Sequence, residues 1–186
     1  MPRDNFLQRK KAVLLKRDKS SKQSWDEKIA KLCEAINKKD DYYTTSSCSG
    51  RIVVMKDEDK KAPNLFEFVS HDLISFEELK KELGKIKKDT KFKQEPPILH
   101  VACKNLKDAF DLLNKARRVG WKRSGVISEG KMFVAELIST EKLEFPLTRK
   151  GKLLVDDNFL KIVLEKANKN LKKSWEKIEK LENLLK

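Results

Sequence analysis

Hydrophobic residues along this chain recur with two different periods, and the changes between them divide the sequence into helices and strands. The first helix is predicted over residues 5–18, where Phe6, Val13 and Leu14 are apolar among many cations. A second helix is predicted to start at Ser24-Trp25-Asp26-Glu27, which fits a capping box. Its apolar positions have helical spacing and are expected to face the core. They are Trp25, Ile29, Leu32, Cys33 and Ile36.

Six short apolar or alternating runs predict strands, because each is too short for a helix and is bounded by polar or turn residues. The runs are residues 52–55, 65–71, 98–103, 121–127, 131–138 and 143–147. Two further helices are predicted between strands: one from a capping box at Ser75 to about Lys88, and one from the cap residue Asn105 to Gly120. These units predict a single α/β or α+β domain with a mixed central sheet flanked by helices.

The chain is predicted to be helical from Asp157 to its end. Small or apolar residues occupy the a and d positions of a heptad there. They are Leu164, Ala167, Leu171, Ser174, Ile178, Leu181 and Leu185. We therefore divide the chain into an α/β domain of residues 1–155, which includes the basic N-terminal helices, and a basic C-terminal helix of residues 156–186. This helix is expected to pack on the core or on a partner subunit in a homodimer, and the alternative is a basic helix laid on RNA.

Charge narrows the class of partner. The chain has 43 Lys and Arg against 29 Asp and Glu, a net charge of +14, which points to RNA, DNA or an acidic membrane surface. No segment approaches the roughly 20 apolar residues of a membrane span, and the first residues lack a secretory signal. The three cysteines show no CxxC spacing, which argues against a disulfide framework and favours a reducing cytoplasm.

The clearest concentration of cations lies in and after the first helix. Five of them are candidates for phosphate contacts: Arg9, Lys10, Lys11, Lys16 and Arg17. Cations on one element release counterions when they meet a nucleic acid, which makes binding favourable and salt-dependent. The alternative is an ordinary solvated helix face.

The segment from Tyr42 to Arg51 is a dense group of hydrogen-bonding side chains. Its centre, Ser46-Ser47-Cys48-Ser49-Gly50-Arg51, comes immediately before the predicted strand at 52–55. Such donors at the end of a sheet suit an anion or a polar ligand, and the alternative is a serine-rich turn whose hydroxyls cap their own backbone. Arg123-Ser124-Gly125 is a second such group, with the alternative that it is a strand start with a bulge glycine.

His71 and His100 are the only histidines, and histidine can exchange protons near neutral pH. His71 ends a predicted strand, which suits a site at the strand's edge. His100 lies in an apolar strand, where a hydrogen-bonded core histidine is common. A zinc site that combines them with Cys48 and Cys103 is disfavoured, because His100 and Cys103 are three residues apart on a strand and point to opposite faces.

Glycine-rich nucleotide-binding motifs are absent from the sequence. Its six glycines are scattered, and no glycine-rich loop joins a first strand to a helix. A doubly wound nucleotide-binding fold is therefore disfavoured.

Taken together, these clusters resemble the tRNA wybutosine-synthesizing protein 3 family in its archaeal form. Order and spacing agree from about residue 5 to residue 150. The matching pieces are residues 46–51, Ser70-His71, residues 95–101, Asp108-Ala109 with the helix that follows, residues 120–126 and residues 143–147. The second strand departs from the family pattern, since it begins Asn64-Leu65-Phe66 without the expected tryptophan.

The resemblance implies methyl transfer from S-adenosylmethionine to a ring nitrogen, N4, of a tricyclic guanosine next to the anticodon of phenylalanine tRNA. It implies that residues 46–51 hold the carboxylate and ribose of the methyl donor, with Arg123, Ser124 and Gly125 as the opposite wall. Residues 1–155 would then form a methyltransferase-like domain.

The resemblance also implies a residue that accepts the ring proton, and His71 is favoured over His100 for this role. The target base lies in a single-stranded loop, where it can stack on an aromatic side chain. Tyr42, Tyr43 and Trp121 are the candidates for this stacking, with the alternative that Trp121 belongs to the core. The basic N-terminal helix would contact the anticodon stem.

Other functions stay open from the residues alone. A non-catalytic RNA-binding module in tRNA or ribosome maturation explains the charge equally well, but it lacks a reason for the clustered serines. A structural adaptor would dimerise through residues 157–186. A hydrolase that uses Cys48 lacks an obvious base. Binding of S-adenosylmethionine separates the enzyme from the RNA-binding module.

Overall fold

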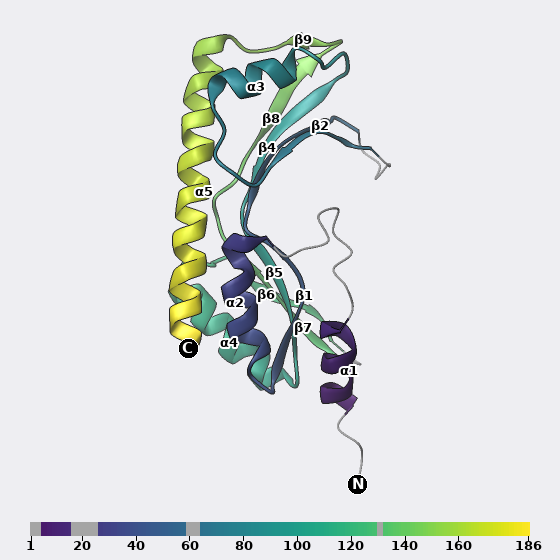
Figure 1. Ribbon diagram of the computed structural model, residues 1–186, viewed down its shortest axis with the longest axis vertical. Helices are drawn as coiled ribbons and strands as arrows, with labels where there is room; N and C mark the ends of the chain where they lie inside the picture. The colour runs from purple at the N-terminus through teal and green to yellow at the C-terminus, as the bar shows by residue number, and fades with distance from the viewer. Residues whose placement is uncertain (1–4, 16–25, 59–63, 130–131) are drawn as a thin grey trace. The chain divides into compact units, whose positions relative to one another are not determined.

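The computed structural model describes residues 5–15, 26–58, 64–129 and 132–186. The chain forms two compact units, each built from segments that are far apart in the sequence (Figure 1). Unit 1 is drawn from Met1–Ser49, Pro97–Thr140 and Trp175–Lys186, and unit 2 from Gly50–Pro96 and Glu141–Ser174. Each unit has its own antiparallel sheet.

Unit 1 contains a four-stranded sheet in the order β1-β5-β7-β6. Its elements in chain order are α1 (Asn5–Leu14), α2 (Glu27–Asn37), β1 (Tyr42–Cys48), β5 (Ile98–Cys103), α4 (Leu106–Arg118), β6 (Gly125–Ser128), β7 (Phe133–Ile138) and the last turns of α5 (Asp157–Leu185). Helices α2 and α4 and the end of α5 pack on one face of this sheet. Helix α1 lies against the other face at β1 (Figure 1).

The core of unit 1 follows from the alternation of side chains along β5. Every second residue of this strand is buried against the helices: Leu99, Val101 and Cys103. The residue between them, His100, therefore points to the opposite face. Trp121 is also completely buried, and its Nε1 donates a hydrogen bond of 3.2 Å to a carbonyl of α5.

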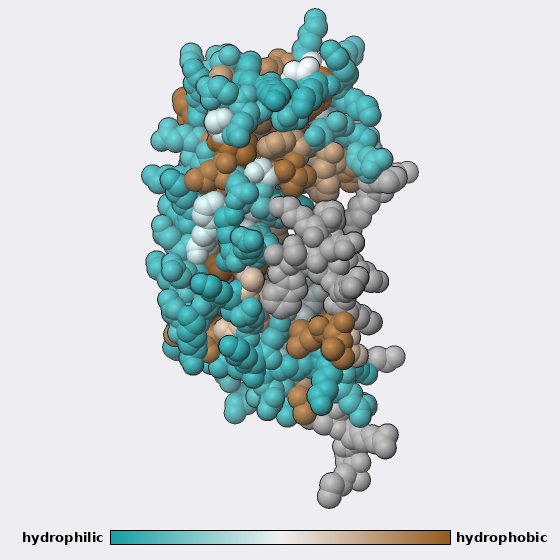
Figure 2. Space-filling view, in the orientation of Figure 1, coloured by the Kyte–Doolittle hydropathy of each residue, from teal (hydrophilic) through white to brown (hydrophobic). Residues whose placement is uncertain are grey.

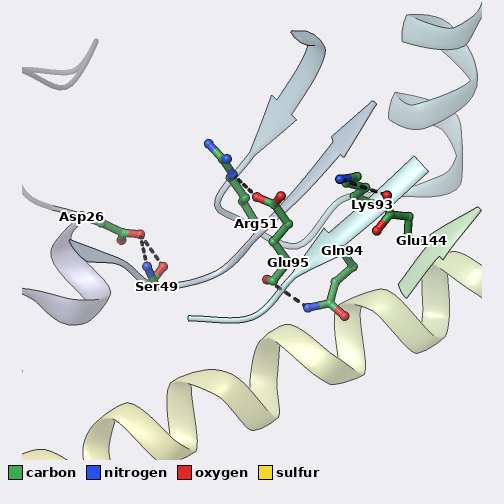
Figure 3. Close-up of polar contacts among 7 residues, drawn as sticks. All are labelled: Asp26, Ser49, Arg51, Lys93, Gln94, Glu95 and Glu144. Carbon is green, nitrogen blue, oxygen red and sulfur yellow. Dashed lines mark hydrogen bonds and ion pairs between the residues drawn. The ribbon is translucent and has the colours of Figure 1, made fainter. Parts of the chain in front are cut away.

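The start of α2 differs from the sequence prediction. The N-cap is Asp26, whose side chain accepts a hydrogen bond from the backbone N–H of Lys28, so the helix begins at Glu27. Ser24 and Trp25 lie outside the described residues. The same Asp26 carboxylate accepts hydrogen bonds from the backbone N–H and the hydroxyl of Ser49 (Figure 3). Asp26 is preferred as the cap because its carboxylate accepts hydrogen bonds from donors at the start of α2 and from Ser49, just after β1.

Unit 2 contains a five-stranded sheet in the order β3-β2-β4-β8-β9. Its elements are β2 (Arg51–Lys56), β3 (Phe66–Ser70), α3 (Phe76–Leu83), β4 (Thr90–Glu95), β8 (Leu143–Arg149), β9 (Lys152–Leu153) and the first turns of α5. Gln94 of β4 is fully buried, and its Oε1 accepts a hydrogen bond of 2.7 Å from Asn170 of α5. Gln94 therefore faces the helix, while its neighbours Lys93 and Glu95 point to the other side of the sheet (Figure 3).

The predicted class is confirmed: the chain is an α/β protein with a long C-terminal helix and not a doubly wound fold. The single mixed sheet is corrected to two sheets in which every pairing is antiparallel. Strands β1 and β4 were not predicted, because they consist largely of hydroxyl-bearing or charged side chains and lack an apolar pattern. The segment predicted as a strand from Trp121 becomes regular only at Gly125, and α3 ends at Leu83 instead of Lys88.

Helix α5 confirms the helix predicted from Asp157. All seven heptad residues are buried within this chain. These residues therefore pack on the core of the same chain, and they are not free to form a heptad interface with a second copy. Dimerisation through another part of α5 stays a prediction. Hydrophilic side chains dominate the visible surface over α5 (Figure 2). Among the described residues, α5 and the other helices are too short or too polar to cross a bilayer.

Candidate functional site

The face of the unit 1 sheet opposite α2 and α4, called the open face below, carries a line of polar side chains across three strands. Ser46 of β1 pairs with His100 of β5, and His100 pairs with Glu136 of β7. Paired residues on antiparallel strands project to the same face, so the three side chains lie next to one another. This set of Ser46, His100 and Glu136 is called the polar row.

Both ring nitrogens of His100 have a hydrogen-bond partner in the polar row. Nδ1 lies 3.0 Å from Oγ of Ser46, and Nε2 lies 3.0 Å from Oε1 of Glu136. The side chains of His100 and Glu136 are 29% and 28% exposed, and the Ser46–His100 contact lies at the surface. A histidine held between a hydroxyl and a carboxylate, and reachable from solvent, is equipped for proton transfer.

A β-bulge sets which hydroxyl meets His100. The register of β1 shifts between Thr44 and Ser46, so the intervening Thr45 is left without a partner residue across the ladder. Thr45 Oγ1 donates instead to the backbone carbonyl of His100 at 3.3 Å, and Ser46 aligns with the imidazole ring. Bulges commonly re-aim a side chain in this way beside functional sites.

Strand alternation divides the serine cluster that the sequence suggested as one ligand cradle. Ser46 and Cys48 face the open side, because they pair with His100 and Ile98. Ser47 faces α2, where its side chain hydrogen-bonds the thiol of Cys33, and burial raises the pKa of that thiol to about 12. Ser49 is fully buried and bonded to Asp26. Ser47 and Ser49 are therefore structural donors.

Gly50 and Arg51 belong to unit 2. Gly50 has a φ of 99°, a left-handed conformation that glycine adopts without strain. Arg51 Nε donates to Glu95 Oε2 at 2.6 Å (Figure 3). The Arg51 guanidinium also lies over the ring of Phe66, with 4.9 Å to the centroid. These contacts hold the guanidinium in one orientation while leaving its side chain 29% exposed.

The second cluster, Arg123-Ser124-Gly125, also separates into different roles. The Ser124 hydroxyl is buried; it donates to the Trp121 carbonyl at 2.6 Å and accepts from the Ile138 N–H at 3.1 Å. Arg123 is exposed. Gly125 pairs with Glu136, and a Cβ placed on it would meet no atom within 4 Å. Gly125 thus leaves open space beside the polar row.

The two histidines lie in different units. His100 is in unit 1, in the polar row, whereas His71 follows β3 in unit 2 and is half-buried. The preference for His71 as the proton acceptor rested on its position at a strand end. The geometry instead favours His100, because both of its ring nitrogens are held by polar partners. Among the described residues, no cluster of three histidines, cysteines or carboxylates is arranged to bind a metal ion.

The proposed nucleic-acid contacts are partly corrected. Lys10 is buried, and its Nζ donates a hydrogen bond of 2.6 Å to the carbonyl of Lys39. Its ammonium group is therefore bound within the protein, and burial lowers its pKa. Arg9 and Lys11 are exposed on α1. Lys16 and Arg17 lie outside the described residues.

The two tyrosines are not available for base stacking in this structure. Tyr42 is buried in the core of unit 1 and donates its hydroxyl to the carbonyl of Asp108. Tyr43 is buried under Phe6 of α1, with ring centroids 5.2 Å apart. Burial raises the pKa of both phenols. The stacking role assigned to both is therefore corrected, because these rings serve the packing of unit 1.

Glu136 was missed at the level of sequence. The only signal was a single acid within an apolar strand, Phe133-Val134-Ala135-Glu136-Leu137-Ile138. That signal means little without the register, because only the pairing of β5 with β7 places this carboxylate against His100.

Fold and site together define a class: a two-sheet α/β protein that carries a hydroxyl–imidazole–carboxylate row on an exposed sheet face. Comparison with known proteins gives the family. Residues 4–186 match the sequence model of the family described as Methyltransferase TYW3. The chain belongs to this methyltransferase family.

Named relatives agree with this assignment. A protein of Archaeoglobus fulgidus, 41% identical over 84% of this chain and 81% of its own length, is named tRNA(Phe) 7-((3-amino-3-carboxypropyl)-4-demethylwyosine(37)-N(4))-methyltransferase. One of Methanocaldococcus jannaschii with the same name is 35% identical over 97% of this chain and 96% of its own. The solved structure of PH1069 from Pyrococcus horikoshii superposes with a TM-score of 0.90 at 33% identity, covering 98% of this chain and 97% of that one.

Proposed function

We propose that this chain is an S-adenosylmethionine-dependent tRNA N-methyltransferase. Its substrate is the tricyclic 4-demethylwyosine-type guanosine next to the anticodon of phenylalanine tRNA, and the methyl group goes to ring nitrogen N4. The proposal extends to this chain what the names of its relatives state for them. It places the protein in the biosynthesis of wybutosine and related bases.

The observation that carries the proposal is His100 between Ser46 and Glu136 on the open face. A ring nitrogen that bears a hydrogen must lose it when it gains a methyl group, so the enzyme needs a proton acceptor near the reacting atom. His100 provides this acceptor on a surface that a splayed-out base can reach.

S-adenosylmethionine supplies a methyl group that is already activated by its sulfonium sulfur, so alignment is the main task left to the protein. The residues of the open face fit such a donor, because Gly125 leaves space beside Glu136 and Arg123 is exposed close to it in the sequence. Arg123 would hold the donor's carboxylate, with Ser46 and Cys48 on the same sheet face. Ser47, Ser49 and Ser124 are left out of this proposed set because their hydroxyls make internal hydrogen bonds.

The net charge of +14 supports tRNA as the partner. We expect tRNA affinity to fall steeply with salt, and neutralising Arg9 and Lys11 to reduce the slope of log K against log salt by about one unit for each phosphate that is no longer neutralised. Lys10→Gln is not a suitable control, since its ammonium is buried. Lys81→Gln, an exposed cation of α3 in unit 2, is the matched control. Binding that stays flat with salt would contradict the electrostatic contribution.

The decisive experiment is transfer of label from methyl-labelled S-adenosylmethionine to phenylalanine tRNA that carries the unmethylated tricyclic base. Unmodified transcript serves as the control. Label that enters only the modified tRNA supports both the reaction and the substrate. Tight tRNA binding without transfer and without donor binding would instead support the RNA-binding module. A cytoplasmic location stays a prediction.

A further inference from the structure

We propose that Glu136 is the positioning residue for His100, and that the ring proton of the substrate leaves through Ser46 Oγ to Nδ1 of His100. This inference rests on the proposed methyl transfer and adds the path of the proton. It gives Ser46 a part in proton transfer, whereas the sequence suggested only a role in ligand binding.

The hydrogen-bond partners define the tautomer of His100. An ionised carboxylate only accepts hydrogen bonds, so Nε2 must donate its hydrogen to Oε1 of Glu136 across the 3.0 Å contact. In the neutral ring Nδ1 then carries the lone pair, and the Ser46 hydroxyl donates to it across the other 3.0 Å contact. Glu136 therefore directs the basic nitrogen of the ring towards Ser46.

Ser46 is the outer end of this arrangement. Both nitrogens of His100 are engaged, and its side chain is only 29% exposed. The hydroxyl of Ser46 lies at the exposed end of its bond to the ring, and its oxygen still has a lone pair after donating to Nδ1. A substrate N–H on the open face thus meets Ser46 Oγ before it meets the imidazole.

The methyl transfer and the loss of the ring proton need no further reactant. As the ring nitrogen forms its bond to the methyl carbon, the sulfur of the donor keeps the electron pair of the broken C–S bond and the ring N–H bond breaks. The ring proton passes to Ser46 Oγ while the hydroxyl proton of Ser46 passes to Nδ1. Ser46 is unchanged, and the imidazolium formed next to the Glu136 carboxylate later releases its proton to water. The carboxylate stabilises that imidazolium, as expected for an orienting acid.

A measurement on the protein alone tests the tautomer. The chain has only two histidines, so NMR of isotope-labelled imidazole nitrogens reports on two rings, and His71→Asn assigns their signals. We expect the wild-type His100 ring in the Nε2–H form, and Glu136→Gln to increase the share of the Nδ1–H form. An Nδ1–H ring in the wild type, or a tautomer that Glu136→Gln leaves unchanged, would overturn the inference.

A kinetic experiment tests the proton path. We expect Glu136→Gln to lower kcat by about tenfold to a hundredfold with little change in KM, because Glu136 orients the base and does not bind the substrate. Glu67→Gln, an exposed glutamate of β3, is the control. A kcat equal to wild type in Glu136→Gln would overturn the role of Glu136.

The hydroxyl is tested by a neighbouring pair of residues. Ser46→Ala should lower kcat by about a hundredfold, whereas Thr45→Ala should stay within about twofold of wild type, because the Thr45 hydroxyl bonds the backbone carbonyl of His100 and not its ring. Equal rates in Ser46→Ala and wild type would exclude the path through Ser46. If even the wild type transfers no methyl group, the proposed function fails, while the NMR measurement still decides the arrangement of His100.

Discussion

The open face of the unit 1 sheet and the outer face of the unit 2 sheet have the same construction and different chemistry. Each sheet is antiparallel, with buried helix contacts on one face and a set of polar side chains on the other, where α1 also covers part of β1 in unit 1. In unit 2 the cross-strand contacts are ion pairs, Arg51 with Glu95 at 2.6 Å and Lys93 with Glu144 at 2.9 Å. In unit 1 they join His100 to a hydroxyl and a carboxylate.

This difference separates a face that carries permanent charges from one that can move a proton. Lysine and arginine keep their charge through the neutral pH range, so partly exposed pairs with carboxylates mainly fix geometry and contribute little free energy. Histidine gains or loses its proton within that range. The open face of unit 1 is therefore the better candidate for the chemistry.

The largest expected effect concerns the cysteines on the two sides of the unit 1 sheet. Burial raises the pKa of Cys33 and of Cys103 to about 12. Because the thiolate is the reactive form, these thiols should react with iodoacetamide at pH 8 at least about a hundredfold more slowly than an exposed cysteine. Cys48 lies on the open face and is partly exposed, so we expect it to be labelled first, as mass spectrometry of digested protein can measure.

Alkylation also tests where the methyl donor binds. S-adenosylhomocysteine, the product of the donor, should protect Cys48 if the donor occupies the open face. Cys48→Ser should keep methyl transfer, because the thiol is not part of the polar row. Complete loss of activity in Cys48→Ser would indicate that this cysteine has a chemical role, as in the rival hydrolase hypothesis. Alkylation of Cys48 that is unchanged by S-adenosylhomocysteine would show that the donor binds elsewhere.

Gly125→Val tests the open space on the same face. A Cβ at this position would have no atom within 4 Å, and the residue pairs with Glu136, so valine fits the strand but projects beside the polar row. We expect KM to rise by about tenfold, roughly 1.4 kcal/mol, with an unchanged melting temperature. Gly84→Val, at the C-cap of α3 in unit 2, is the control for a glycine substitution away from the site. An unchanged KM in Gly125→Val would show that nothing binds over this residue.

Arg51→Ala tests whether Arg51 holds the donor's carboxylate in place of Arg123. The guanidinium of Arg51 is held by Glu95 and Phe66 and is 29% exposed. With Arg123 as the partner of the carboxylate, we expect Arg51→Ala to stay folded and to bind S-adenosylhomocysteine within about twofold of wild type. A loss of about tenfold would assign the carboxylate to Arg51, since an oriented guanidinium suits it. Lys93→Ala, on the same face and paired with Glu144, is the control. Equal affinities in Arg51→Ala and wild type, by calorimetry, would restrict Arg51 to a structural role.

The smallest effect is expected at Glu144. Hydrogen bonds from Lys142 and Lys93 lower the pKa of this carboxyl. A group whose pKa is lowered by folding adds stability above its unfolded pKa, and this stability disappears as the pH falls through its folded pKa. Glu144→Gln should therefore lower the free energy of unfolding by about 0.5 kcal/mol at pH 7, a small value because solvent screens this partly exposed carboxylate. At acid pH, where the carboxyl is protonated in both states, the substitution should not change the free energy of unfolding. Urea unfolding at both pH values measures the difference, and a cost that persists in acid would contradict an ionic origin.

Local sequence signals predicted the helices well. The capping box at Ser75 and the cap at Asn105 are both present in the structure. Such caps involve residues three positions apart, so the signal and the structure are in the same short segment. The strand β5 was equally clear, because an apolar run around His100 fits the interior of a sheet.

The polar strand β1 was harder to predict. Its sequence from Tyr42 to Cys48 is rich in hydroxyls, and these residues favour turns as much as strands. Only the pairing with β5 makes it a strand, and its alternation then sends Ser46 to the open face and Ser47 to α2. A cluster that is continuous in sequence is therefore divided in space.

The sequence by itself determined the class of fold, the long C-terminal helix, the positive charge and the resemblance to a methyltransferase family, because these depend on local periodicity, composition and the order of motifs. Only the tertiary structure decided which residues form the site. Ser46, His100 and Glu136 are brought together by the register of three strands and by one bulge. Register depends on pairing between distant segments, and a shift of one residue would turn each side chain to the other face.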